Sequence, residues 1–310
     1  MPLFLNEEDI RGLLAPVDAV GAVERCCARM AAGSIDLAPR RRLRLDEGRF
    51  ADMAASDLEL GYAAVKAYAG FASGAAFVVS LFATDRPETV ALIEADYLGR
   101  LRTGGASAVA AKYLAREGAK SLGVIGCGDQ AETQVTCIRA ALPGIERVVA
   151  YCRTERSLNE FCERVGAEPG ENHRDPAEQD IVVTITTSRD PVVRGEWLRP
   201  GALVCAAGAN NPASRELDNV VIERAAFVCC DWKEQARLES ADLIEPVELG
   251  ALDWLEVHEL HEVVAGELPG RQSPDDIVVF KSNGIAAWDV AIAAAAVERA
   301  RERGVGTELR

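Results

Sequence analysis

The chain has 310 residues, a net charge of −15 from 49 acidic and 34 basic side chains, and a hydrophobic content of 49%. This length predicts two globular domains, and the acidic charge disfavours nucleic acid and anionic membranes as partners, because both would repel the surface. No apolar run approaches the ~20 residues of a membrane span, and acids stand where a signal peptide carries lysine or arginine, so we expect a cytoplasmic protein.

The nine cysteines are odd in number and scattered along the chain without a CxxC pair. This pattern is typical of reduced, mostly buried thiols and indicates neither a disulfide framework nor a zinc site.

The first third of the chain predicts two packing helices and then an antiparallel sheet. Asn6 can cap a helix at 7–14, and Pro16 suits the first turn of a second helix. Short apolar or alternating runs separated by turn residues then predict strands, and an alanine-rich helix follows them. The expected strands are 42–45, 49–53, 62–68, 76–82 and 89–95, and the expected helix is 98–117.

Residues 121–156 predict a strand, a tight glycine turn, a helix and a second strand. The apolar run 122–125 meets Gly126-x-Gly128-x-x-Ala131, and a helical pattern and the apolar run 148–151 follow. Glycine lets the backbone turn sharply and approach a pyrophosphate, which then binds at the positive end of the helix. A purely structural turn is the alternative, but the flanking strands and helix are the context that a dinucleotide site requires.

The end of the second strand indicates which dinucleotide binds. NAD sites usually place an acid there for the ribose 2′-hydroxyl, whereas NADP sites supply arginine for the 2′-phosphate. Here Cys152 is followed by Arg153, Thr154 and Arg156, with no acid at the strand end. We therefore expect NADP(H) in preference to NAD(H), although two solvated arginines at a helix start remain the alternative.

Strands and helices continue to alternate beyond residue 156, which predicts an α/β fold with a doubly wound parallel sheet of the Rossmann type. The expected elements are a helix through Phe161 and Val165, strands at 180–185, 202–207, 226–230 and 277–280, and helices at 215–224 and 286–303.

Few residues suggest chemistry by themselves. His258 and His261 are three residues apart, which is not the HExxH spacing of zinc enzymes, so we expect no metal. Cations are more informative. They are Arg40 to Arg42, Lys66 and Arg102. A lysine or arginine within a sheet or at the glycine-rich start of a helix is poorly solvated and needs an anionic partner. That partner is a substrate carboxylate or one of the protein's own acids.

The chain resembles the ornithine cyclodeaminase/mu-crystallin family. The matching stretches run in order along nearly the whole chain: LRT at 101–103 with AAKYLA, GVIGCGDQA at 123–131, GANNPASRELD at 208–218, GELPGRQS at 266–273, VFKSNGIAAWDVAIA at 279–293 and the tail GVGTEL. The resemblance implies a discontinuous α+β substrate-binding and dimerisation domain, 1–112 plus 283–310, around a Rossmann domain, 113–282. It also implies a homodimer.

The resemblance further assigns roles to single residues. A substrate carboxylate is expected to bind Lys66, Arg102 and Arg40, although Arg41 or Arg42 can replace Arg40 in the triple-arginine run. The residues expected at the cofactor are Thr103, Gly126, Gly128, Asp129, Gln130, Ala131, Arg153, Thr154, Arg156, Thr186, Gly208 and Asn210.

Two departures from the family pattern affect the expected activity. Cyclodeaminases carry an aspartate where this chain has Asn210 and a glutamate where it has Ala51. An amide cannot act as a base or neutralise an ammonium. We therefore expect an NAD(P)H-dependent reductase of a C=N bond next to a carboxylate, such as pyrroline- or piperideine-2-carboxylate. Lys66 is expected to donate the proton or to stabilise the iminium, with simple binding of the carboxylate as the alternative, and Asn210 is expected at the nicotinamide. The alternatives are an alanine-type dehydrogenase, a cyclodeaminase, or a mu-crystallin-like protein that binds NADPH and a small ligand.

Overall fold

The computed structural model covers residues 1–310 and forms two compact units. Unit 1 comprises Met1–Arg102 and Ile285–Arg310, and unit 2 comprises Thr103–Gly284. The division falls inside helix α3 (Asp96–Leu114), not at its end. One glycine of α3 explains this: a Cβ on Gly104 would lie 2.2 Å from the carbonyl oxygen of Thr133, so the second part of α3 packs closely against other residues of unit 2 and belongs to it.

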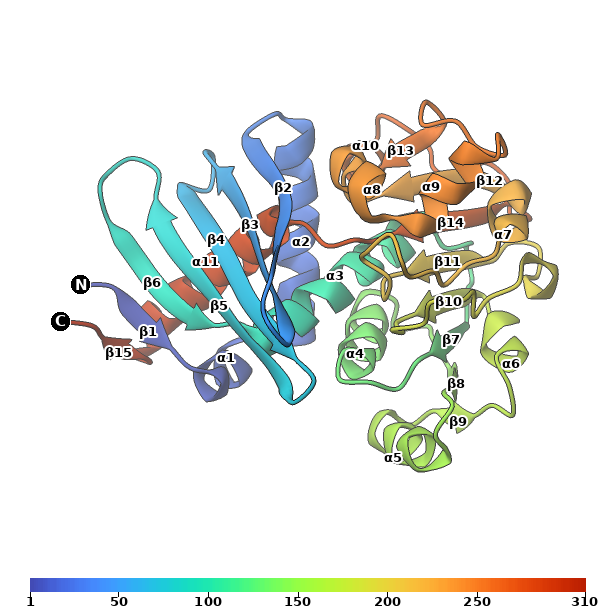
Figure 1. The fold of residues 1–310 in the computed structure, drawn as a ribbon, viewed down its shortest axis with the longest axis horizontal. Coiled ribbons are helices and arrows are strands. Elements are labelled where there is room, and N and C mark those ends of the chain that lie inside the picture. Colours follow the sequence, from blue (N-terminus) through green and yellow to red (C-terminus); the bar gives the residue numbers. More distant parts are fainter. The chain divides into compact units, whose positions relative to one another are not determined.

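Unit 1 is an antiparallel sheet with helices on one face (Figure 1). The strand order is β15-β1-β6-β5-β4-β3-β2, and only β1 and β6 run parallel. Its helices are α1 (Glu7–Leu13), α2 (Pro16–Ala31), the first part of α3, and α11 (Ala286–Arg303); its strands are β1 (Leu3–Leu5), β2 (Ile35–Arg44), β3 (Gly48–Asp57), β4 (Tyr62–Phe71), β5 (Gly74–Ala83), β6 (Thr89–Glu94) and β15 (Thr307–Glu308).

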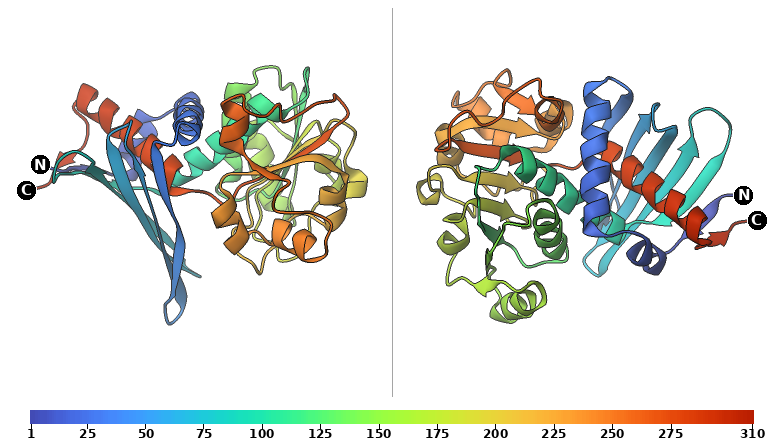
Figure 2. Two further views of the ribbon diagram at one scale, coloured as in Figure 1. Left: turned by 90° about the horizontal axis from the view of Figure 1, so that it is seen from above. Right: turned by 180° about the vertical axis from the view of Figure 1, so that it is seen from behind.

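Helix α11 lies across the sheet of unit 1, with α2 beside it on the same face (Figure 2). The side chains of β4 alternate accordingly: Ala64 and Lys66 are buried beneath the helices, whereas Val65 points to the open face. Asn6 caps α1 as expected, since its side chain accepts a hydrogen bond from the Asp9 amide and the Asp9 carboxylate accepts one from the Asn6 amide.

Unit 2 is a Rossmann-type domain, as the alternating pattern predicted. Its eight strands are all parallel, in the order β13-β12-β14-β11-β10-β7-β8-β9. After α3, its elements are β7 (Ser121–Ile125), α4 (Ala131–Ala141), β8 (Arg147–Tyr151), α5 (Glu155–Val165), β9 (Glu168–Pro169), α6 (Arg174–Ala177), β10 (Ile181–Thr184), the 3-10 turn η1 (Gly195–Trp197), β11 (Leu203–Ala206), α7 (Asn219–Arg224), β12 (Ala225–Cys230), α8 (Lys233–Glu239), α9 (Ala241–Glu248), β13 (Val257–Glu259), α10 (Leu260–Val264) and β14 (Ile277–Lys281).

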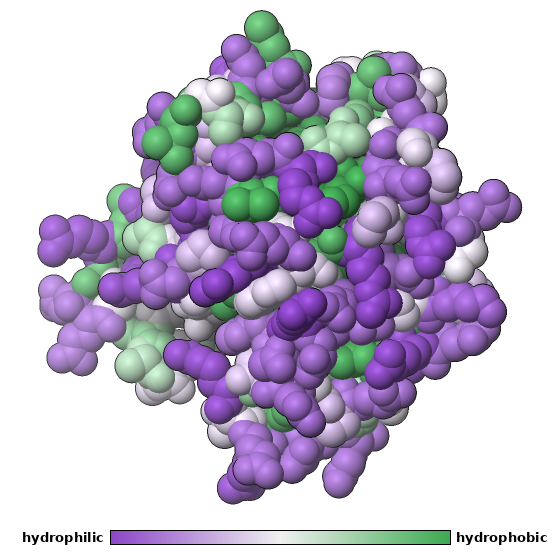
Figure 3. Space-filling model, turned by 90° about the vertical axis from the view of Figure 1, so that its right-hand side faces the viewer, coloured by the Kyte–Doolittle hydropathy of each residue, from purple (hydrophilic) through white to green (hydrophobic).

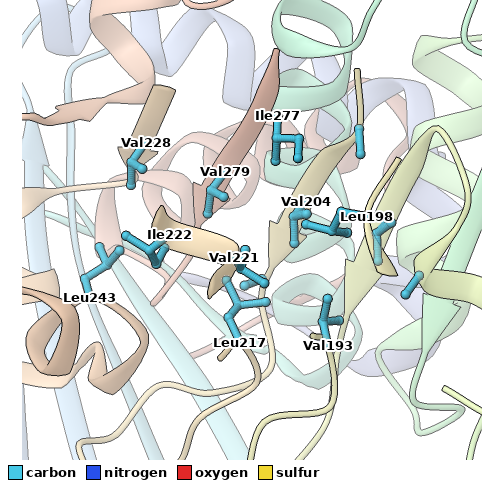
Figure 4. Packing of buried hydrophobic residues seen from close by; sticks show 14 of the residues in the cluster. Val193, Leu198, Val204, Leu217, Val221, Ile222, Val228, Leu243, Ile277 and Val279 are labelled. Atoms are coloured by element: carbon cyan, nitrogen blue, oxygen red, sulfur yellow. The ribbon is translucent and has the colours of Figure 1, made fainter. Parts of the chain in front are cut away.

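The core of unit 2 is built from apolar strands that are buried on both faces. Figure 4 shows valine and isoleucine side chains from β11, β12, β14 and α7 meeting in one cluster with leucines from other segments, and the cluster includes Val204, Val221, Val228 and Val279. Continuous apolar strands of this kind are typical of a covered parallel sheet. The molecular face in Figure 3 is mostly hydrophilic with small apolar areas.

Two features differ from the sequence-based prediction. The helix expected at 215–224 begins only at Asn219, because the Asp218 side chain caps it by accepting from the Val221 amide, while the Glu216 and Leu217 amides donate to Asp242. The short elements β1, β9, β13, β15, α6 and α8 to α10 were not predicted. None of the helices combines the length and apolarity needed to cross a bilayer.

Candidate active site

The glycine turn after β7 has the geometry that its sequence predicted. Gly126 adopts a φ of +106°, and a Cβ there would lie 2.5 Å from the carbonyl oxygen of Ile185. Only glycine fits this position. Gly128 is different: it is exposed, and a Cβ added there would meet nothing within 4 Å. The turn thus leaves open space in front of the first turn of α4, which is where a pyrophosphate binds in dinucleotide folds.

A cavity of about 490 Å³ lies beside this turn, entirely within unit 2. Its walls include Gly126 and Gly128, Arg153 and Thr154 after β8, and Thr186 after β10. These residues follow the carboxyl ends of neighbouring parallel strands, where open α/β sheets bind their ligands. The size, the glycine turn and the exposed residues just before α4 together fit a dinucleotide.

The other residues expected at the cofactor are not part of this cavity wall. Thr103 is buried in α3, Ala131 is buried at the start of α4, and Asp129 and Gln130 are exposed just before α4. Gly208 and Asn210 lie in the loop after β11.

The end of β8 carries no carboxylate. Arg153 and Thr154 line the cavity, whereas Arg156 points away and pairs with Glu160 at 2.7 Å. His173 also lines the cavity, and burial, followed by the positive charge of Arg153, lowers its pKa.

Glu216 ties together the loops after β10 and β11. Its fully buried carboxylate accepts from the Thr186 amide (2.7 Å) and hydroxyl (2.9 Å) and from the Gly208 (2.7 Å) and Ala209 (2.9 Å) amides. The sequence analysis missed this residue, which stands in the matched stretch GANNPASRELD.

Lys281 also stabilises the loop after β11. Its fully buried ammonium donates to the Ala209 carbonyl at 2.6 Å and lies 3.0 Å from the Asp242 carboxylate. The residue immediately before Asn210 is therefore held through both its amide and its carbonyl.

A separate cluster of charged side chains is buried in unit 1. Lys66 on β4 and Arg102 on α3 both donate to one oxygen of Asp289 on α11, at 2.9 and 3.2 Å. Arg40 on β2 is also buried, with a guanidinium nitrogen 3.8 Å from the Met53 sulfur. The sequence-based alternative that these cations pair with the protein's own acids thus holds for Lys66 and Arg102, but a single carboxylate serves both.

The fold also separates the three consecutive arginines of β2. The pairing of β2 with β3 shifts register between Ala38 and Arg41, and this irregularity places Arg40 beneath the helices. Arg41 points outward, 72% exposed, and pairs with Asp52 at 3.0 Å, while Arg42 is half-buried. Of the three, Arg40 shares the buried face with Lys66.

Burial lowers the pKa of Lys66 to about 8, with repulsion from Arg102 and Arg40 adding to the effect and Asp289 opposing it. Burial alone would raise the pKa of Asp289, but Lys66 and Arg102 outweigh it and lower that pKa. The cluster therefore holds a lysine that titrates near neutral pH beside a carboxylate that stays ionised. Asp289 was not among the residues predicted from sequence, although it is an acid in the apolar first half of the helix and lies in the matched stretch at 279–293.

The structure brings no group of three or more histidine, cysteine or acidic side chains into a metal-binding arrangement. His258 instead stacks on Phe227, with ring centroids 4.9 Å apart, and His261 lies 3.3 Å from Glu259.

Comparison with known proteins gives one consistent result. The family model "Ornithine cyclodeaminase/mu-crystallin family" matches residues 1–304. The Δ1-pyrroline-2-carboxylate reductase of Bacillus cereus is 38% identical over 230 residues, covering 72% of this chain and 70% of the relative.

Two solved structures resemble the chain over its length. The Thermococcus litoralis Δ1-pyrroline-2-carboxylate reductase in complex with NADH and L-proline has a TM-score of 0.93 at 30% identity, covering 99% of this chain and 100% of the other. An archaeal alanine dehydrogenase dimer with bound NAD also has a TM-score of 0.93, at 31% identity, with coverage of 100% and 99%. The chain therefore belongs to the ornithine cyclodeaminase/mu-crystallin family, as its motifs indicated.

Proposed function

We propose that this protein is an NAD(P)H-dependent oxidoreductase that reduces a C=N bond next to a carboxylate and gives an L-amino acid. The observation that carries the proposal is a buried cluster in which Lys66 and Arg102 share the single carboxylate of Asp289, with Arg40 buried on the same face of the sheet. Such a cluster suits an anionic substrate, because a second carboxylate would offset its excess positive charge. The reaction also requires a bound nicotinamide cofactor, and the cavity of unit 2 suits one.

Each side chain has a distinct role in this proposal. Arg40 and Arg102 bind the substrate carboxylate and so fix the orientation of the adjacent imine carbon. Lys66, with a pKa of about 8, donates a proton to the imine nitrogen. Asn210 is assigned to the nicotinamide end of the site, and the cofactor, when bound, would supply the hydride.

The residues argue against ring closure by deamination. That reaction needs an acid near the distal amine, but this chain has Asn210 and Ala51 at the two positions where cyclodeaminases carry acids. Neither side chain accepts a proton at neutral pH.

Steady-state assays test the proposal. NADPH and NADH oxidation is measured with pyrroline-2-carboxylate, piperideine-2-carboxylate, and pyruvate with ammonia or methylamine. The proposal expects the highest kcat/KM with a preformed cyclic imine. A higher value with pyruvate and ammonia would favour the alanine-type dehydrogenase, to which the similar archaeal structure lends support. No oxidation with any compound would favour a mu-crystallin-like binding protein.

We infer further that the cofactor is NADP(H) in preference to NAD(H). The support is Arg153 and Thr154 in the cavity wall and the lack of an acid at the end of β8. The two similar structures contain NADH and NAD, so this preference would set the chain apart from them.

Arg153→Ser is expected to weaken NADPH binding about 10-fold and to leave NADH binding unchanged, because only NADPH presents a phosphate for a charge-assisted hydrogen bond. The dissociation constants are measured by fluorescence titration. Arg156→Ser is the matched comparison and should have a smaller effect, because Arg156 pairs with Glu160. Tighter binding of NADH than NADPH by the unaltered protein would contradict the preference.

We also infer that two copies associate through the open face of the unit 1 sheet. Val65, Val78 and Phe82 are 38–43% exposed on neighbouring strands β4 and β5, and the paired positions Ala63 and Ala67 are small and apolar. A largely apolar sheet face of this kind, with Ser80 as the residue opposite Val65, is typical of an interface. The similar archaeal structure is a dimer.

A cytoplasmic location is also part of the proposal, supported by nine cysteines of which none forms a disulfide.

Val65→Glu is expected to convert a dimer into a monomer, because it places a charge in the middle of this apolar face. Light scattering during size-exclusion chromatography should give twice the chain mass of 33.2 kDa for the unaltered protein and the single mass for the variant. Leu255→Glu, at an 84% exposed position in unit 2, is the control and should stay dimeric. A monomeric unaltered protein would contradict this assembly.

A further inference from the structure

Asp289 is the one carboxylate within the apolar stretch of α11 that covers the sheet. It is 1% exposed, and the neighbouring Ala287, Trp288 and Val290 are fully buried. One of its oxygens, Oδ1, accepts from both Lys66 and Arg102, whereas the buried Oδ2 accepts no hydrogen bond from the protein. Burying an ionised carboxylate costs free energy unless its partners compensate, and here the partners are two groups assigned to the substrate.

Gly99 leaves space for the ammonium group of the same lysine. It lies in α3 just before Arg102, and a Cβ added there would come within 2.9 Å of the Lys66 ammonium nitrogen. The lysine therefore occupies space that any other residue at position 99 would fill. Asp289 on α11 and the bare backbone at Gly99 on α3 together define where the ammonium lies.

We propose that Asp289 is the positioning residue of this site, holding the Lys66 ammonium and the Arg102 guanidinium on one oxygen while Gly99 leaves the space for the ammonium. The inference rests on the proposed function, since it assigns Lys66 as proton donor and Arg102 as carboxylate ligand. A single shared acceptor leaves the other N–H donors of both cations for the substrate.

The charged groups around Lys66 make the role measurable. They are Asp289 from α11, Arg102 from α3 and Arg40 from β2, and the residues paired with Lys66 on β3 and β5, Met53 and Val79, do not titrate. Asp289 is the neighbour that favours the ammonium. Because an ammonium is present below its pKa, kcat/KM of the unaltered enzyme should fall as the pH rises through about 8.

Asp289→Asn keeps the shape of the side chain but removes its charge. The fall of kcat/KM at alkaline pH should then occur about one pH unit or more lower, because Arg40 and Arg102 repel the ammonium and Asp289 no longer compensates for this repulsion. At pH 7.5 a shift of one unit should lower kcat/KM about 3-fold, and a larger shift should lower it further, because a smaller fraction of Lys66 is then an ammonium. The unaltered protein and the variant are assayed with the same substrate, so protonation of the substrate itself affects both pH profiles equally. Asp18→Asn is the control. It removes a carboxylate of α2 that pairs with Arg299 of α11, the helix that also carries Asp289, and it should leave the pH dependence of kcat/KM unchanged.

Gly99→Ala tests the space independently of the charge. Alanine favours a helix over glycine, so the variant should fold at least as well as the unaltered protein. The added methyl group should displace the ammonium and lower kcat about 10-fold or more, with the cofactor dissociation constant unchanged. Gly12→Ala in α1, where a Cβ meets nothing within 4 Å, is the matched control and should keep full activity.

The results separate this inference from the proposed function. An unaltered enzyme that reduces imines, with an unchanged pH dependence of kcat/KM in folded Asp289→Asn or full activity in Gly99→Ala, would overturn the positioning role alone. If Asp289→Asn does not fold, Gly99→Ala decides. An unaltered protein that reduces no imine would overturn both.

Discussion

Replacing Lys66 by methionine is expected to lower kcat for imine reduction by about 10²- to 10⁴-fold, the usual contribution of a positioned proton donor. Methionine matches the length of the lysine stem and suits a site that is 3% exposed, so the sheet should persist. Unit 2 contains the dinucleotide cavity, so the cofactor dissociation constant should stay within about twofold of its original value.

Single-turnover measurements with preformed imine separate this loss from any change in product release. The control is Lys120→Met, since Lys120 is an exposed lysine that pairs only with the exposed Glu146. That variant should keep full activity. Turnover by Lys66→Met within tenfold of the unaltered enzyme would remove Lys66 from the mechanism.

Replacing Lys281 by methionine is expected to lower the free energy of unfolding by about 3–5 kcal/mol. The substitution leaves the fully buried Asp242 without its counter-ion and the Ala209 carbonyl without its donor. An unpaired buried charge is costly even where the intact pair contributes little. The loop that carries Asn210 should loosen as well, so cofactor affinity should fall with stability.

Urea unfolding, followed by fluorescence of the four tryptophans, measures the loss. Lys281→Met combined with Asp242→Asn should recover part of it, because the second change removes the uncompensated charge. Lys120→Met again serves as the exposed comparison and should cost less than about 1 kcal/mol. A loss below about 1 kcal/mol for Lys281→Met alone would contradict the structural role of this pair.

The parts of the fold that local sequence determines were predicted well. The glycine turn at Gly126 and the helix 286–303 were placed correctly, because a φ of +106° requires glycine and a long alanine-rich run favours helix. Short elements were missed: β1 and β15 have three and two residues, which is too few for a period to appear.

The contacts within the candidate site could not be predicted from local sequence patterns. Lys66 and Asp289 are 223 positions apart in the sequence, and no periodicity links them. Composition alone favoured pairing of the cations with the protein's own acids, and family resemblance pointed to a substrate carboxylate. The structure shows the pairing with the protein's own acid for Lys66 and Arg102, which share Asp289, and the substrate carboxylate stays a prediction. The register shift in β2 that separates Arg40 from Arg41 likewise depends on pairing with β3.

The transfer of hydride to the carbon between nitrogen and carboxylate is the central claim, and isotope labelling tests it most directly. The protein is incubated with Δ1-pyrroline-2-carboxylate and NADPH that carries deuterium at both positions of nicotinamide C4. The account predicts L-proline one mass unit heavier than normal, with the deuterium at Cα. Unlabelled proline, or cofactor that remains unoxidised under conditions where the protein is folded and binds it, would contradict the account.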